Sequence, residues 1–179
     1  RTYLHAFEEN ENYQLIDISH NGYDFMDDPM FHRRRVVRLA GDIFVIEDRV
    51  TGICHSEHDI RLYYNFAFGH LEQDGESFAY TSQKGRPYTV TVQADKPLDF
   101  EILEGSEEPI GGWISYGYAW RKPIPQLIAK HAGKAPIHFV TVLAPAGTKA
   151  QAAIKGDAAE VTLADGKVLT LTENGVELH

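Results

Sequence analysis

The stretch RRRVVRLAGDIFVIEDRV, residues 33–50, carries the clearest structural signal in the chain. Arg35 to Leu39 and Ile43 to Val50 are rich in β-branched residues, and Gly41-Asp42 stands between them. Glycine readily adopts the positive φ that a tight turn requires, so the pattern predicts two strands joined as a hairpin. Three consecutive arginines, Arg33 to Arg35, then lie on or beside the first strand. We expect two of them to pair with acidic residues across the sheet while one faces a partner.

The segment on the N-terminal side of this hairpin concentrates groups that could carry chemistry. His20, Tyr23, Asp24 and His32 supply imidazole, phenol and carboxylate groups around Asn21-Gly22. Imidazole and phenol can act as base and acid, and a carboxylate can orient a histidine. The alternative is a capped turn in which Asn21-Gly22 forms the bend and Asp24 binds nearby amides. Tyr13 to Ile18 could form a short strand that enters this segment.

Alternating apolar and polar residues continue through most of the chain. The clearest runs are Ile60 to Phe68, Tyr88 to Ala94 and Leu98 to Ile102, followed by the apolar segment Ile137 to Leu143 and short runs separated by Asp165-Gly166 and Asn174-Gly175. Such short, regularly spaced strands predict an all-β fold. We expect one domain over residues 1–179, a two-sheet antiparallel β-sandwich with little helix. Only Gln126 to His131 could form a helical turn, and Ala144 to Ala159 is expected to be a loop or edge region.

The composition limits the classes of function. The chain has 179 residues, 43% of them hydrophobic, and a formal net charge of -9. This acidity argues against nucleic-acid binding, which requires clustered lysine and arginine. One cysteine, Cys54, excludes an internal disulfide. No apolar run is long enough for a membrane helix. Because the chain begins at Arg1 without a methionine, we expect it to be a piece of something longer or a processed product.

The remaining motifs give no complete active site. His55 and His58 flank Ser56-Glu57, but on a strand or loop this spacing directs the two rings to opposite faces, so we predict no metal ligands in this chain. There is no glycine-rich phosphate loop, nucleophile elbow, CxxC or HExxH motif. We therefore predict no catalytic residues here.

An aromatic segment near the middle of the chain is a candidate glycan surface. Trp113, Tyr116, Tyr118 and Trp120 precede Arg121-Lys122. Exposed aromatic rings can stack on sugars, and adjacent cations can pair with uronate carboxylates. The alternative is that these rings close one end of the hydrophobic core.

Taken together, these motifs resemble the C-terminal domain of heparinase II/III-like polysaccharide lyases. The resemblance extends over about Asp17 to Pro145 and rests on six segments: His20 to Tyr23, Phe31 to Arg34, Ile46 to Gly52, Leu62 to Phe68, Gly112 to Tyr118 leading to Pro125, and Phe139 to Pro145.

The resemblance implies a β-sandwich that follows an (α/α) toroid in the full-length protein, with the substrate cleft between the two. Enzymes of this family cleave uronate-containing glycans, such as glycosaminoglycans or alginate, by β-elimination. The family's catalytic Asn, His and Tyr lie mainly on the toroid, and a structural zinc is possible in the full-length protein. This chain lacks the toroid and the Gly-His-x-His segment, so the isolated chain is expected to be inactive.

The candidate substrate contacts are therefore supporting ones: His20, Tyr23, Arg34, Trp113, Tyr116, Tyr118 and Trp120. The expected partners are the N-terminal toroid of the same protein and an anionic polysaccharide, with no nucleic acid and no membrane. The resemblance favours a bacterial periplasmic or secreted location. The competing hypotheses are a free-standing carbohydrate-binding module and a purely structural domain.

Overall fold

The computed structural model describes residues 1–179 and contains strands but no helix. All paired strands are antiparallel, which confirms the all-β prediction. No segment forms a helix that could cross a bilayer.

The largest sheet has eight strands. Gly41 and Asp42 both have positive φ, 77° and 57°, at the connection between its third and fourth strands, which confirms the hairpin predicted there. The strands of this sheet, in spatial order, are β1 (Thr2–Glu9), β2 (Tyr13–Tyr23), β3 (Met30–Leu39), β4 (Ile43–Gly52), β15 (Ile137–Pro145), β8 (Pro87–Ala94), β7 (Ser77–Ser82) and β6 (Gly69–Asp74).

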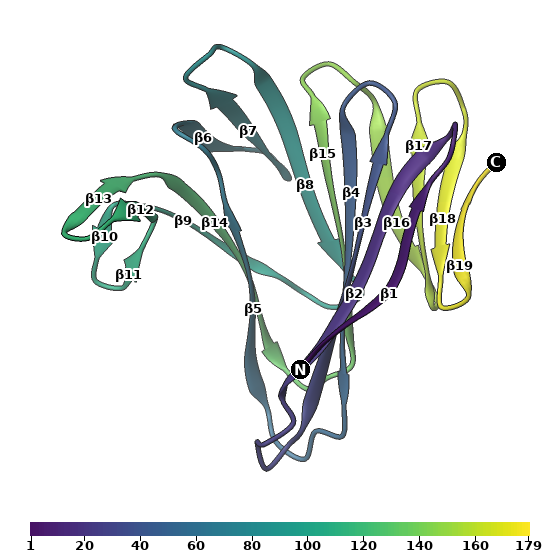
Figure 1. Ribbon diagram of the computed structural model, residues 1–179, viewed down its shortest axis with the longest axis horizontal. Helices are drawn as coiled ribbons and strands as arrows, with labels where there is room; N and C mark the ends of the chain where they lie inside the picture. Colours follow the sequence, from purple (N-terminus) through teal and green to yellow (C-terminus); the bar gives the residue numbers. More distant parts are fainter.

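Two smaller sheets lie on opposite faces of the large one, so the larger sheets form three layers instead of the two expected (Figure 1). One face is covered by β5 (His58–Asn65), β14 (Pro125–Gly133) and β9 (Asp99–Glu104). The other is covered by β16 (Ala150–Lys155), β17 (Ala158–Leu163), β18 (Val168–Thr172) and β19 (Gly175–Leu178).

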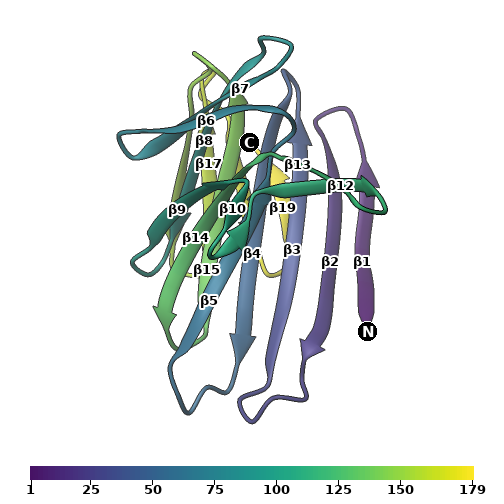
Figure 2. The same cartoon turned by 90° about the vertical axis from the view of Figure 1, so that its left-hand side faces the viewer.

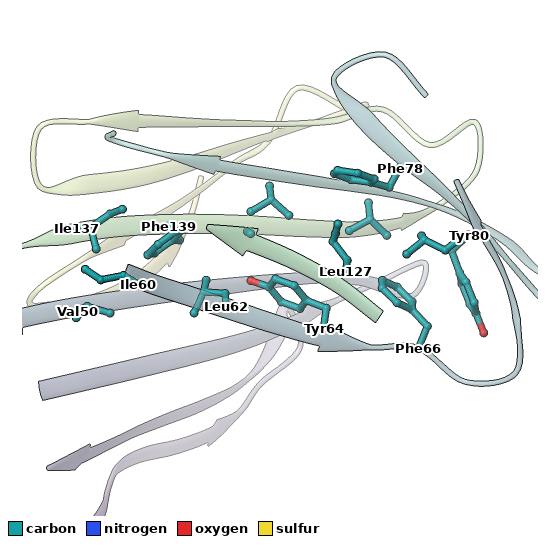
Figure 3. Packing of buried hydrophobic residues seen from close by; sticks show 14 of the residues in the cluster. Val50, Ile60, Leu62, Tyr64, Phe66, Phe78, Tyr80, Leu127, Ile137 and Phe139 are labelled. Atoms are coloured by element: carbon teal, nitrogen blue, oxygen red, sulfur yellow. The ribbon is translucent and has the colours of Figure 1, made fainter. Parts of the chain in front are cut away.

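Each pair of layers encloses its own hydrophobic core. Between the large sheet and β5–β14–β9, side chains such as Tyr64, Leu127 and Phe139 interdigitate (Figure 3). Between the large sheet and β16–β19, the core includes Val45, Val142 and Leu171. Strand β15 contributes to both cores, which explains why it is buried along most of its length without the alternation of a half-buried strand.

One expectation about local structure is wrong. Gln126 to His131 forms no helical turn, because it belongs to β14 and pairs on both sides, with β5 and β9. Of the two alternatives for Ala144 to Ala159, a loop or an edge region, the edge holds for Ala150 to Lys155, which is the edge strand β16 and pairs with β17. Two short hairpins extend from the β5–β14–β9 layer and comprise β10 (Ser106–Glu107), β11 (Ile110–Gly111), β12 (Trp113–Gly117) and β13 (Trp120–Pro123).

Candidate functional site

The three consecutive arginines of β3 all pair with carboxylates, one more than the two expected. Arg33 binds Asp17 of β2 through two hydrogen bonds of 2.8 and 2.5 Å. Because side chains alternate along a strand, Arg34 and Arg35 point to opposite faces of the large sheet. Each of them meets an acidic residue of β4, and the two resulting clusters differ in their access to solvent.

The cluster on the face toward β5 is centred on Asp48, whose side chain is fully buried. Arg34 donates from Nε and Nη2 to the two Asp48 oxygens at 2.6 and 3.0 Å. His32 Nε2 lies 2.6 Å from Asp48 Oδ1, and His32 Nδ1 lies 3.2 Å from His20 Nε2. The chain of contacts thus runs from a buried carboxylate through two imidazoles to the C-terminal part of β2. We call it the open cluster and define it as His20, His32, Arg34 and Asp48.

The hydrogen bonds of the open cluster fit one arrangement of protons. Gly22 N–H donates to His20 Nδ1 at 3.1 Å, so that nitrogen is an acceptor and the proton of a neutral ring sits on Nε2. His20 Nε2–H then donates to His32 Nδ1, and His32 Nε2–H donates to Asp48. Every ring nitrogen is used in this arrangement. Burial, followed by the influence of His32, lowers the pKa of His20, in keeping with this arrangement. Neither ring has a free lone pair with which to act as a base.

Tyr64 lies beside the open cluster and is also held neutral. Its hydroxyl is 2.7 Å from Thr141 Oγ1, and the Arg34 guanidinium lies 5.9 Å from its ring centre. Burial raises the pKa of Tyr64, and the charge of Asp48 raises it further. A tyrosine that resists ionisation and is buried in the core cannot serve as a base for a solvent-borne substrate.

A cleft of about 750 Å³ opens in front of Arg34 and His32, between β3 and β5. Its floor includes apolar residues such as Met30 and Leu62, while Tyr23 and Tyr63 on opposite sides are each 48% exposed. His20 does not line the cleft itself but lies against Tyr23, with ring centres 5.5 Å apart. Of the predicted constellation of His20, Tyr23, Asp24 and His32, the structure brings the first two and His32 together, with Arg34 beside them. Asp24 points elsewhere and accepts a hydrogen bond from Asn21 Nδ2 at 2.7 Å.

The large sheet continues beyond the cleft as a face that no other layer covers. Strands β1, β2 and β3 extend past the edge of the β5–β14–β9 sheet (Figure 2). On this side Leu4, Phe7 and Ile16 are 67%, 69% and 42% exposed, and Leu4 and Phe7 are paired with Ile18 and Ile16. We call these residues, Leu4, Phe7, Ile16 and Ile18, the uncovered apolar face. Contiguous exposed apolar residues of this kind mark interaction surfaces.

The second carboxylate cluster lies on the opposite face and is sealed. Arg35, Glu47 and His138 are 1%, 1% and 6% exposed. Arg35 pairs with Glu47 and donates to Thr172 O at 2.5 Å, while His138 Nε2 lies 2.7 Å from Glu47 Oε1. Burial alone would raise the pKa of Glu47, but hydrogen bonds from His138 and Arg35, with the charges of Arg35 and Arg49, hold it at about 2. This sealed cluster, Arg35, Glu47 and His138, ties the large sheet to the turn between β18 and β19.

The four aromatic candidates do not close the core. Tyr118 is fully exposed, Tyr116 is 73% exposed and Trp120 is 37% exposed. All three lie on the β12–β13 hairpin. The fourth candidate, Trp113, is half-buried and donates from Nε1 to Ser106 O at 2.9 Å. The hairpin is separated from the open cluster, so the structure places the seven predicted contact residues in two groups.

The residues at the cleft do not fit a metal site. No group of three His, Cys, Asp or Glu side chains is placed to hold an ion. The nitrogens of His20 and His32 are engaged with each other and with Gly22 and Asp48. His58 lies 2.9 Å from Asp28, whose pKa is lowered by hydrogen bonds from the Ser56 backbone, His58, the Ser56 hydroxyl and the His55 backbone. This donor set does not suit the zinc that the resemblance implies for longer relatives.

Asp48 and Glu47 are the site residues that the sequence motifs missed. Both stand in the quoted stretch, in the middle of β4, but neither was singled out. The pairs Arg34 with Asp48 and Arg35 with Glu47 arise because Leu39 pairs with Ile43, which makes the connection three residues long. A two-residue turn at Gly41-Asp42 would instead have paired Arg35 with Asp48, so the register could not be read from that turn signal.

Comparison with protein families gives one match, a family described as "Heparinase II/III-like, C-terminal", over residues 2–158. Among solved structures, a heparinase III described as the BT4657 gene product aligns over 95% of this chain with a TM-score of 0.75 and 18% identity. Another heparinase III aligns over 95% with a TM-score of 0.72 and 20% identity. The heparan sulfate lyase HepC from Pedobacter heparinus aligns over 100% with a TM-score of 0.72 and 13% identity.

These structural alignments cover only part of the other proteins. The chain spans 27% of both heparinase III chains and 28% of HepC. At such low identity the likeness establishes the shared fold alone. A comparison with curated protein sequences gave no match.

Proposed function

This chain belongs to the heparinase II/III-like C-terminal family, and we propose that it is the C-terminal β-domain of a polysaccharide lyase, where it supports the substrate cleft. The observation that carries the proposal is the uncovered apolar face of β1 and β2, which lies on the same side of the large sheet as the cleft in front of Arg34. A closed, free-standing domain gains nothing from leaving Leu4 and Phe7 in water. The preceding part of the polypeptide, an (α/α) toroid, would cover this face and complete the cleft.

The chemistry of β-elimination assigns the reacting groups to that other part. The reaction needs a base to remove the C5 proton of a uronate, a group that neutralises its carboxylate, and an acid for the leaving oxygen. In this chain the nitrogens of His20 and His32 are occupied, and the pKa of Tyr64 is raised by burial. We therefore propose no catalytic residue here. Arg34 neutralises the charge of Asp48, which in turn orients His32. Tyr23 and Tyr63 lie at the edges of the cleft surface that would contact the glycan.

The proposed substrates are uronate-containing polysaccharides, and the proposed location is the periplasm or the extracellular space. A carbohydrate-binding module without a lyase partner is the second candidate, and the exposed rings of the β12–β13 hairpin favour it. The two candidates differ in whether the uncovered apolar face has an intramolecular partner.

The test uses the full-length protein and the 179-residue chain in parallel, following the absorbance of unsaturated uronate products. The chain alone is expected to release none. In the full-length protein, Leu4→Asp and Phe7→Asp are expected to split a shared thermal unfolding transition into two and to reduce kcat/KM, because charge on this face opposes docking. Ile110→Asp, at an equally exposed apolar residue of β11, is the matched control. Lyase activity of the chain alone, or unchanged unfolding of both face variants, would contradict the proposal.

A further inference from the structure

The β12–β13 hairpin has two faces, and only one of them is explained by packing. On the first face, Arg121 lies 4.1 Å above the Trp113 ring and binds Glu107 at 2.5 Å. The Trp113 indole donates to Ser106 O. These contacts join the hairpin to its neighbour, β10–β11.

The second face presents two stacked aromatic rings and a lysine to solvent. Tyr116 and Trp120 have ring centres 5.3 Å apart with an interplanar angle of 33°. Lys122 Nζ lies 5.6 Å from the Trp120 ring centre. The ion pair of the hairpin joins Arg121 to Glu107, which leaves the Lys122 ammonium without a carboxylate partner. We call Tyr116, Trp120 and Lys122 the presented face.

The turn of the hairpin is closed by local contacts. Ser115 Oγ lies 2.9 Å from Gly117 O and 2.7 Å from Trp120 O, so it links the two strands across the turn. Ala119 adopts a positive φ of 56°, a conformation that non-glycine residues rarely accept, and this completes the turn after Tyr118. The turn places Tyr116 and Trp120 side by side, so a ligand meets two rings at once.

We infer that the presented face is a separate subsite for an anionic sugar unit, with a pyranose ring stacked on Tyr116 and Trp120 and its carboxylate on Lys122. The inference rests on the proposed function and adds a second contact to it. Aromatic faces pair with the C–H face of a pyranose, and the free ammonium selects a unit that carries negative charge. Glu104 shares a shallow pocket with Lys122, which opposes a high density of anions. The subsite therefore favours an unsulfated uronate over a heavily sulfated one.

The position of the hairpin suits a substrate that continues toward the cleft. Figure 2 shows β12 and β13 reaching from the β5–β14–β9 layer across the side on which strands β1 to β3 are uncovered. A polysaccharide that contacts the presented face can thus extend toward the cleft in front of Arg34. The subsite would add affinity for long chains without touching the reacting bond.

The test titrates the 179-residue chain with an unsulfated polyuronate hexasaccharide, monitored by tryptophan fluorescence and calorimetry. Trp120→Ala is expected to weaken binding on the order of tenfold, because a stacked ring contributes about one such factor. Lys122→Gln is expected to weaken it by up to about fivefold at low salt and less at high salt. Trp113→Phe, on the first face of the hairpin, is the matched control and should bind as the unmodified chain does.

The inference would be overturned if the unmodified chain did not bind the hexasaccharide. It would also be overturned if Trp120→Ala and Lys122→Gln bound it as tightly as the unmodified chain does. Finally, it would be overturned if the unmodified chain bound the carboxyl-reduced hexasaccharide or polyglutamate as tightly as the hexasaccharide. Thermal unfolding of each variant checks that the fold is retained, and Lys122→Gln removes no packing group. A negative result for glycan binding would leave the proposed function open, because domain docking is tested with Leu4→Asp and Phe7→Asp and does not involve the hairpin residues.

Discussion

Arg34 and Arg35 are neighbours in sequence, yet they anchor two clusters of the same chemistry in different surroundings. Each binds an acidic residue of β4, and each acidic residue also contacts a histidine, His32 in the open cluster and His138 in the sealed cluster. The sealed cluster lies under the β16–β19 sheet, where Arg35 is 1% exposed. The open cluster lies at a cleft, where the Arg34 side chain is 29% exposed.

The difference shows which part of the molecule is complete. The β16–β19 sheet supplies Thr172 O and Gly175 O to Arg35, so the chain itself closes the sealed cluster. No layer of this chain closes the open cluster or the uncovered apolar face beside it. Strand β3 thus has one face that is buried in the chain's own core and one face that is left for a contact outside this chain.

The largest effect is expected from Glu47→Ala in the sealed cluster. Removing the carboxylate leaves the buried Arg35 guanidinium without its counter-charge, and breaking a buried pair on one side costs about 3–5 kcal/mol. The free energy of unfolding from denaturant titration measures the loss. Lys155→Ala is the control, because its pair with Glu160 is exposed and is expected to contribute at most about 1 kcal/mol. Equal losses for the two variants would show that the sealed cluster is not buried in solution.

A smaller loss is expected from Asp48→Asn in the open cluster. The substitution keeps the volume but removes the charge that accepts from Arg34 and His32, and hydrogen bonds to charged groups contribute about 1.5–3 kcal/mol. Solvent at the cleft can rehydrate Arg34 in part, so we expect about 2 kcal/mol, less than for Glu47→Ala. A loss as large as that of Glu47→Ala would mean that the open cluster is covered.

The two clusters should also respond to acid in different pH ranges. Burial lowers the pKa of His20 below its ordinary value of 6.5, so the unfolded chain takes up this proton first and stability falls as the pH drops below 6.5. The pKa of Glu47 is lowered from 4.5 to about 2, so its contribution is complete above 4.5 and is lost as the pH falls toward 2.

Unfolding free energies measured across this pH range test the assignment. His20→Gln should flatten the dependence just below pH 6.5 and leave the lower range unchanged. Glu47→Gln should do the reverse, flattening the range between 4.5 and 2. A variant that alters both ranges equally would argue against two independent clusters.

Much of this fold follows from local sequence. Period-two alternation and the Gly41-Asp42 turn predict the strands β3, β4, β5 and β8, although β3 begins at Met30, five residues before the predicted start. The helical turn expected over Gln126 to His131 is wrong because Leu127, Ile128 and Ala129 are all buried, so the alternation of a half-buried strand is absent. For β16 the sequence left a loop and an edge region open, because alanine favours strands weakly, and pairing with β17 decides the conformation. In both segments the tertiary surroundings decide.

The same limit applies to the site. His20, Tyr23 and His32 stand close enough in sequence for their association to be inferred across a single strand connection. The third layer could not be inferred, because nothing local in β16 to β19 states which face of the large sheet it covers. Whether the Arg34 and Arg35 side chains are exposed or buried depends on which layers cover the two faces of the large sheet. Their exposure is therefore set by the tertiary arrangement.

The smallest effect is expected on the uncovered apolar face, and its smallness is informative. In the 179-residue chain, Phe7→Thr should change the free energy of unfolding by no more than about 0.5 kcal/mol, because Phe7 is 69% exposed and threonine keeps the strand preference. Leu171→Ala, in the core between the large sheet and β16–β19, should lower the free energy of unfolding by about 2–5 kcal/mol. If Phe7→Thr instead destabilised the chain strongly, the face would already be covered in solution. Sedimentation at several concentrations would then show whether a second copy covers it, and docking of a toroid would no longer be needed to explain why Leu4 and Phe7 are apolar.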